Sequence, residues 1–156
     1  MAIEEDITVL ERVPTFAVLG RDALRILAIG AENREVAPGE VLFVAGDVAD
    51  AGFLIQEGSF SLRDGSPESG SEMMIAKAGA LLGEFALLKE TSRPVSAVAV
   101  EQARVLRIAR TLFLKMLEGY PDAAQRLRAY MASRASRTAD DISKIGSALH
   151  PHDRRR

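Results

Sequence analysis

The middle of this 156-residue chain is divided into short apolar runs by turn-forming residues. Pro38-Gly39, Gly46-Asp47 and Glu57-Gly58 separate runs rich in valine, leucine, isoleucine and phenylalanine, and a polar loop follows at 64–71. Runs too short for helices, bounded by glycine turns at intervals of about eight to twelve residues, are typical of antiparallel strands. Residues 34–109 are therefore predicted to form a β-roll or jelly roll. We interpret its three turn glycines as structural, with no role in ligand binding.

The periodicity becomes helical on both sides of this segment. Apolar residues recur every three or four positions before and after the predicted roll, over 3–13, 23–29, 111–117 and about 121–149. We therefore predict an α+β fold in which N-terminal helices and a long C-terminal helix flank the roll. Residues 1–149 are expected to form a single domain, with lid helices at 110–149, and 150–156 to form a basic tail.

One stretch inside the roll departs from the strand pattern and carries the chemistry of a binding site. Gly83 lets a ligand approach the backbone closely, and the short apolar turn after it can offer backbone N–H groups to a phosphate. Arg93 supplies a planar cation that pairs with phosphate oxygens. Glu84 would repel a phosphate but can accept hydrogen bonds from a sugar hydroxyl. Together these residues describe a site for a sugar phosphate.

This stretch resembles the phosphate-binding cassette of the cyclic nucleotide-binding domain family, which includes the catabolite activator protein and the regulatory subunits of protein kinase A. The family pattern is Gly-Glu, an apolar residue, Ala or Gly, Leu, a short loop, Arg, two small residues, then Ser or Thr. Here the cassette occupies residues 83–96 and reads Gly83-Glu84-Phe85-Ala86-Leu87, then Arg93-Pro94-Val95-Ser96. The resemblance covers about residues 13–135. It implies a β-roll that binds a cyclic nucleotide, with cAMP favoured over cGMP.

The resemblance also implies a role for individual residues. Glu84 would hold the ribose 2′-hydroxyl, Arg93 would hold the cyclic phosphate, and the N–H of Ala86 would assist Arg93. Gly83 would admit the ribose. The other ligand contacts expected from the matching positions are Phe85, Pro94, Val95 and Ser96, with Thr138 of the long helix against the base and Arg134 and Tyr130 as further lid candidates.

Pro94 departs from the family pattern. Family members place a residue with a free N–H directly after the arginine, whereas proline has none. Losing one hydrogen bond to a charged group removes roughly 1.5–3 kcal/mol. Two functions therefore stay open: a cyclic nucleotide sensor, which we favour, and a degenerate family fold that acts as a ligand-free interaction module.

The output of a sensor would have to pass through a partner protein or through its own oligomeric state. No helix-turn-helix follows the long helix in this sequence, so we expect a free-standing sensor. Leu127, Met131, Thr138 and Ile145 recur near heptad spacing, which allows a homodimer through that helix. Residues 1–110 hold 11 basic and 17 acidic residues, net −6, and residues 111–156 hold 9 and 5, net +4. We interpret the basic end as a solvated helix and tail rather than a nucleic-acid site.

Other functional classes lack the residues that they need. The chain has no cysteine, and its two histidines, His150 and His152, lie in the tail without further ligands for a metal. Glu84 and Arg93 have no accompanying nucleophile or second acid, so we do not expect an enzyme. No apolar run approaches 18 residues and the N-terminus is acidic, so we expect a cytoplasmic protein without a membrane partner or a cofactor other than its ligand.

Overall fold

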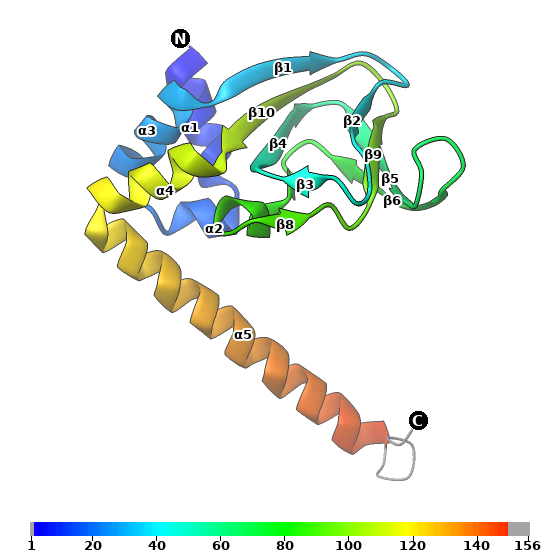
Figure 1. Ribbon diagram of the computed structural model, residues 1–156. Coiled ribbons are helices and arrows are strands. Elements are labelled where there is room, and N and C mark those ends of the chain that lie inside the picture. Colours follow the sequence, from blue (N-terminus) through cyan, green and yellow to red (C-terminus); the bar gives the residue numbers. More distant parts are fainter. Residues whose placement is uncertain (1, 150–156) are drawn as a thin grey trace.

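Helices lie at both ends of the chain and strands lie between them in the computed structural model, which describes the backbone of residues 2–149 and the side chains of residues 3–136 (Figure 1). Three helices precede the strands: α1 (Ala2–Glu11), α2 (Pro14–Ala17) and α3 (Arg21–Gly30). Two follow them: α4 (Arg110–Gly119) and α5 (Pro121–Leu149). The predicted order of roll and flanking helices, including the long C-terminal helix, is confirmed.

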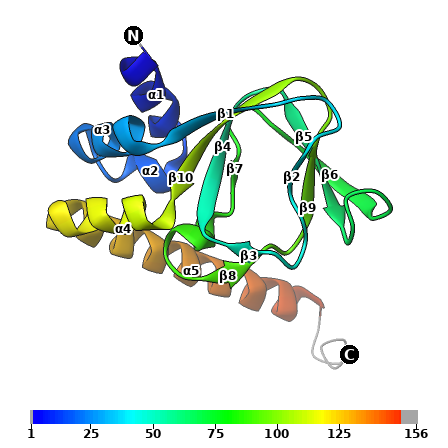
Figure 2. The same ribbon diagram turned by 45° about the horizontal axis from the view of Figure 1, so that its top comes forward.

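Every strand pair of the described chain is antiparallel. One four-stranded sheet has the order β1 (Glu32–Val36), β10 (Ala103–Ala109), β4 (Ala51–Glu57), β7 (Leu81–Leu82). A second has the order β2 (Val41–Phe43), β9 (Ser96–Ala99), β5 (Ser59–Asp64), β6 (Ser71–Lys77), and β3 (Val48–Ala49) pairs with β8 (Thr91–Ser92). These sheets enclose the interior of the roll (Figure 2), so the predicted α+β β-roll is confirmed.

The two central strands of the first sheet, β10 and β4, are covered on both faces. Along β4, Phe53 and Ile55 belong to the core inside the roll, whereas Leu54 belongs to the core under the helices. Successive side chains of a strand point to opposite faces, so this one strand joins two cores. Val105 and Leu106 of β10 divide in the same way. The three consecutive large apolar residues of β4, Phe53, Leu54 and Ile55, are thereby explained.

The helical core fixes where the cassette lies. Phe16 of α2 packs against Phe113 of α4, with ring centroids 6.0 Å apart, and Leu127 of α5 is buried in the same cluster. Leu87 ends a short 3₁₀ helix, η1 (Glu84–Leu87), and also belongs to this cluster. The cassette is therefore anchored to the helices at both ends of the chain.

Helix α5 packs on the body through its first turns and then extends past the roll (Figure 1). Leu127, the first residue of the heptad pattern, is used in the chain's own core. Thr138 and Ile145 lie outside the residues whose side chains are described, so the homodimer and the base contact of Thr138 stay predictions. Within residues 2–149, no helix has both the length and the apolar character needed to cross a bilayer.

Candidate ligand-binding site

A cavity of about 400 Å³ lies where the cassette meets the roll. Seven of the nine predicted contact residues line it: Gly83, Glu84, Phe85, Ala86, Arg93, Pro94 and Val95. Sequence reasoning did not find the rest of the wall, which is Phe43, Ala49, Leu62, Leu81, Leu82, Thr91 and Ser92. Most of these side chains are apolar, so the cavity suits a ligand with a flat or apolar body beside a charged group.

Gly83 brings the cassette backbone against the arginine. It has φ = 83°, in the left-handed region, and precedes the first residue of η1. A Cβ at this position would lie 2.5 Å from Arg93 Nη1 and 3.2 Å from the carbonyl oxygen of Ala51. Glycine is therefore required here by both backbone conformation and space.

Arg93 is the charged group of the cavity wall. It is 5% exposed, and its Nη2 donates a hydrogen bond of 2.9 Å to the carbonyl oxygen of Ala51. Its guanidinium carbon lies 4.5 Å from the ring centroid of Phe43 and 5.3 Å from that of Phe53. Among the residues that the structure describes, Nη1 has no hydrogen-bond partner. Burial lowers the pKa of Arg93 from its ordinary value. A buried cation with an unused donor is costly unless an anion satisfies it.

Glu84 connects the cassette to both helical ends of the chain. Its Oε2 accepts a hydrogen bond from Thr15 Oγ1 of α2 and another, of 2.9 Å, from Arg134 Nη1 of α5. The bond to Glu84 is the main cause that raises the pKa of Arg134 above its ordinary value. Arg134, a candidate for covering the base, thus contacts Glu84. Thr15 lies 69 positions from Glu84, and no local signal indicated the contact.

Other predicted contact residues have partners within the protein. The N–H of Ala86 donates to the carbonyl oxygen of Gly83 at 3.1 Å. Ser96 is fully buried, does not line the cavity, and joins the N–H of Ala45 to the carbonyl oxygen of Gly65. Phe85, by contrast, is 60% exposed at the cavity. The ligand-binding role of the nine residues stays a prediction.

Arg110 fastens the start of α4 to the cassette, a role that the sequence did not indicate. Its Nη1 donates to the carbonyl oxygens of Ala49 and Ala86, at 3.0 and 3.4 Å. Arg110 directly follows β10 and is the first residue of α4. A displacement of η1 would therefore disturb the hydrogen bonds of Arg110 at the junction between the roll and α4.

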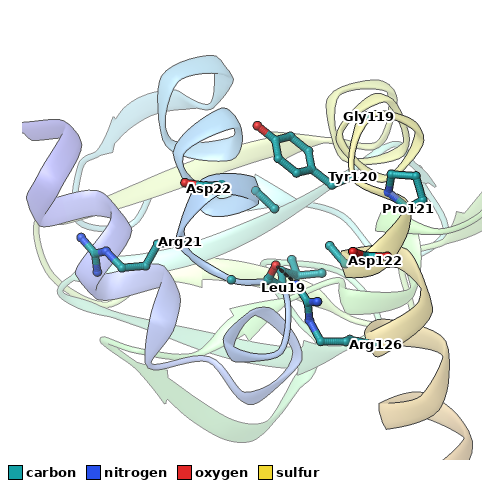
Figure 3. Close-up of a pocket in the computed structure, with 11 residues that line it drawn as sticks. Leu19, Arg21, Asp22, Gly119, Tyr120, Pro121, Asp122 and Arg126 are labelled. Atoms are coloured by element: carbon teal, nitrogen blue, oxygen red, sulfur yellow. Dashed lines mark hydrogen bonds between the residues drawn. The ribbon is translucent and has the colours of Figure 1, made fainter.

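A second cavity, also of about 400 Å³, lies between the start of α3 and the α4–α5 corner (Figure 3). Its two arginines are already engaged: Arg21 with Glu4 and Glu11 of α1, and Arg126 with backbone carbonyls of the segment before α3. Figure 3 shows Arg21 directed toward α1 and Arg126 reaching toward Leu19. This cavity offers no unsatisfied charge comparable with that of Arg93.

A β-roll with a cavity beside a helix-anchored cassette, and with a buried arginine in the cavity wall, is the architecture of a domain that could hold an anionic ligand. Residues 33–120 match the family model described as the cyclic nucleotide-binding domain. The chain belongs to that family, as the cassette resemblance predicted.

Several known proteins are similar to this chain. The HTH-type transcriptional regulator Cmr of Mycobacterium tuberculosis is 32% identical over 120 residues, covering 77% of this chain and 49% of that protein. The cyclic AMP receptor protein of Thermus thermophilus is 34% identical over 111 residues, covering 69% and 51%. The solved N-terminal domain of a transcriptional regulator from Streptomyces coelicolor A3(2) has 26% identity and a TM-score of 0.78, covering 86% of this chain and 94% of that one. This chain thus spans about half the length of the two curated relatives.

Proposed function

We propose that this protein is a sensor module that binds a cyclic nucleotide, with cAMP preferred over cGMP, and that it signals through a partner protein or through its own oligomeric state. The observation that carries the proposal is the buried guanidinium of Arg93, whose Nη1 lacks a partner in the described part of the chain. The cyclic phosphate of a nucleotide carries one negative charge and would supply the missing acceptor. The similar protein of Thermus thermophilus is a cyclic AMP receptor protein by name, which favours cAMP.

The remaining wall fits the other parts of such a ligand. Apolar side chains such as Leu62 and Val95 offer a surface for the base, and Glu84 offers carboxylate oxygens to the ribose hydroxyl. Because η1 is tied to α4 through Arg110 and to α5 through Glu84, an occupant of the cavity would bias how both helices are seated. Such a bias is a population shift driven by differential affinity.

Calorimetric titration with cAMP and cGMP tests the proposal. We expect a Kd for cAMP of about micromolar or tighter, and a loss of about ten-fold or more in Arg93→Met, because a charge-assisted hydrogen bond is removed. Arg107→Met is the matched control, since Arg107 pairs with Asp50 at 3.3 Å and does not line the cavity. A melting temperature unchanged by millimolar nucleotide would refute ligand binding, because a ligand of the native state must raise it.

Specific observations also favour a second candidate, a ligand-free interaction module. Pro94 has no N–H to offer, the N–H of Ala86 is bonded to Gly83, and Glu84 already holds Thr15 and Arg134. Two backbone donors that a phosphate could use are therefore missing or engaged, and part of the acceptor capacity of Glu84 is occupied. A ligand-free module would bind neither nucleotide, and Arg93→Met would not change its affinity for a partner protein. The titration with cAMP and cGMP therefore separates the two candidates.

A further inference from the structure

A further cavity, of about 270 Å³, lies between α1 and the sheet that contains β1, β10 and β4. Its walls come from all four elements: Glu5, Asp6 and Val9 of α1, Asn33 of β1, Gln56 of β4 and Arg104 of β10. None of these residues lines the cavity at the cassette. The two cavities are therefore separate, and each can be studied without the other.

Asp6 occupies a position in α1 that is otherwise surrounded by apolar side chains. Ile7 and Leu10 of the same helix are fully buried in the helical core, and Asp6 is only 5% exposed. Its Oδ1 accepts a hydrogen bond of 2.9 Å from Gln56 Nε2, and no described residue donates to its Oδ2. In the described part of the chain only Arg93 Nη1 is both sealed from solvent and unpartnered, so Oδ2 of Asp6 opens into the cavity. A buried carboxylate with an unused oxygen is costly unless a cation or a donor satisfies it.

Carboxylates outnumber cations around this cavity. Glu5 and Asp6 line it together with a single guanidinium, that of Arg104. Arg104 is already paired, since its Nη2 lies 2.7 Å from Glu57 Oε2. Glu35 of β1 lies opposite Arg104 in the strand pairing and adds a further negative charge. The charge balance near the cavity is therefore negative, and it favours a cationic ligand.

The acceptor groups of the cavity indicate which kind of cation fits. An alkylammonium group carries three N–H donors, and the walls offer it oxygen atoms of Asp6, Glu5 and Asn33. Val9 adds an apolar side chain that can contact an alkyl chain. Among the residues whose side chains are described, no three His, Cys, Asp or Glu side chains are grouped as metal ligands. Hydrogen-bond donors therefore match these oxygen atoms better than a metal ion does.

We propose that this cavity is a second ligand site, which binds the ammonium group of a small aliphatic primary amine through Asp6, with Glu5 and Asn33 at the mouth. Glu5 and Asn33 are exposed, whereas Asp6 is buried. Burial is the main cause that raises the pKa of Asp6 above its ordinary value, and a bound cation would lower that pKa again. The site goes beyond the proposed nucleotide binding and does not depend on it.

Titration of the isotope-labelled full chain with butylammonium, followed by nuclear magnetic resonance at constant ionic strength, tests the proposal. We expect the side-chain amide signals of Asn33 and Gln56 to shift with a Kd of about 1 mM, because the ligand has few non-hydrogen atoms. Butyltrimethylammonium has the same charge and chain but no N–H donor. It is expected to bind about ten-fold more weakly or not at all, because it cannot donate to the carboxylate.

Three variants locate the site. Asp6→Asn keeps an acceptor for Gln56 but removes the charge, so it should weaken butylammonium binding about ten-fold or more. Asn33→Asp adds a carboxylate at the mouth and should strengthen binding about three-fold. Glu11→Gln is the matched control, because it removes one charge from the same helix outside the cavity, and it should change the affinity by less than about two-fold.

A pH series gives a second readout. In the parent chain the affinity for butylammonium should fall as the pH is lowered through the raised pKa of Asp6, because only the ionised carboxylate attracts the cation. The fall should be smaller in Asp6→Asn, in which Glu5 is the remaining acid of the cavity wall.

Several results would overturn the proposal. The amide signals of Asn33 and Gln56 might not move well above the expected Kd, or Asp6→Asn might bind as tightly as the parent. Equal binding of the two alkylammonium ions would show attraction by charge alone, and tighter binding of Mg²⁺ at the same residues would show a metal site. None of these results depends on cAMP, so the proposed nucleotide binding stands or falls separately.

Discussion

Replacing Gly83 with alanine should damage the binding site far more than it damages the fold. The added Cβ would lie 2.5 Å from Arg93 Nη1, well inside van der Waals contact. The end of an arginine can usually move aside, but this one is held by Ala51 through Nη2 and packs on Phe43. The guanidinium would therefore have to leave its place in the cavity wall.

Gly39 provides a control for the backbone cost. It has the same φ of 83°, and a Cβ there would meet nothing within 4 Å. An L-residue in the left-handed region costs about 1–2 kcal/mol, so each alanine variant should lose about this much stability. In a domain of this size each kcal/mol lowers the melting temperature by about 2–4 °C. The Gly83 variant should exceed this loss only slightly, because its closest clash is with the end of a side chain.

Titration with cAMP and thermal melting of both variants provide the assay. Gly83→Ala is expected to bind about ten-fold or more weakly than the parent, the effect of losing one charge-assisted hydrogen bond. Gly39→Ala should bind like the parent at a similar melting temperature. Equal affinity in the two variants would refute the reasoning, because the contact between Gly83 and Arg93 would then not position the ligand.

Two further predictions concern stability. Ser96→Ala should cost about 1–3 kcal/mol in chemical denaturation, because it leaves the N–H of Ala45 without its hydroxyl acceptor; a change below the error of the measurement would contradict this. Burial raises the pKa of Asp6 above its ordinary value. The contribution of Asp6 to the free energy of unfolding is therefore fully present below its ordinary pKa and is lost as the pH rises through the raised pKa of the folded state. Asp6→Asn keeps an acceptor for Gln56, and its melting temperature relative to the parent should be higher at pH 7 than near pH 3; a difference independent of pH would contradict the assignment.

Some features of the fold could not be predicted from the sequence because no local pattern encodes them. Strands β3, β7 and β8 have two residues each and exist only through their partners, as in the pairing of Val48 with Ser92. The strand β4 was predicted, but its part in two cores depends on the helices that cover its outer face. Helix α2 is a single turn, too short to show an apolar periodicity.

In the candidate site, too, some features follow from local sequence and others depend on distant segments. Seven cassette residues line one cavity because they are close in the chain. Local chemistry indicated Gly83, Glu84 and Arg93, and the family resemblance indicated the other four. The partners of Glu84 come from α2 and α5, at sequence separations of 69 and 50 residues. A single sequence does not indicate that two polar side chains so far apart in the chain are in contact.

The chain's local chemistry therefore determined the class of fold and the cassette: glycines where the backbone must turn, alternating apolar residues where strands are buried, and a glycine, an acid and an arginine at fixed spacing. Only the tertiary structure decided that the arginine is buried with an unused donor and that the acid is held by α2 and α5. The physical reason is that turns and periodicity depend on neighbouring residues, whereas burial and ion pairing depend on which distant segments pack together.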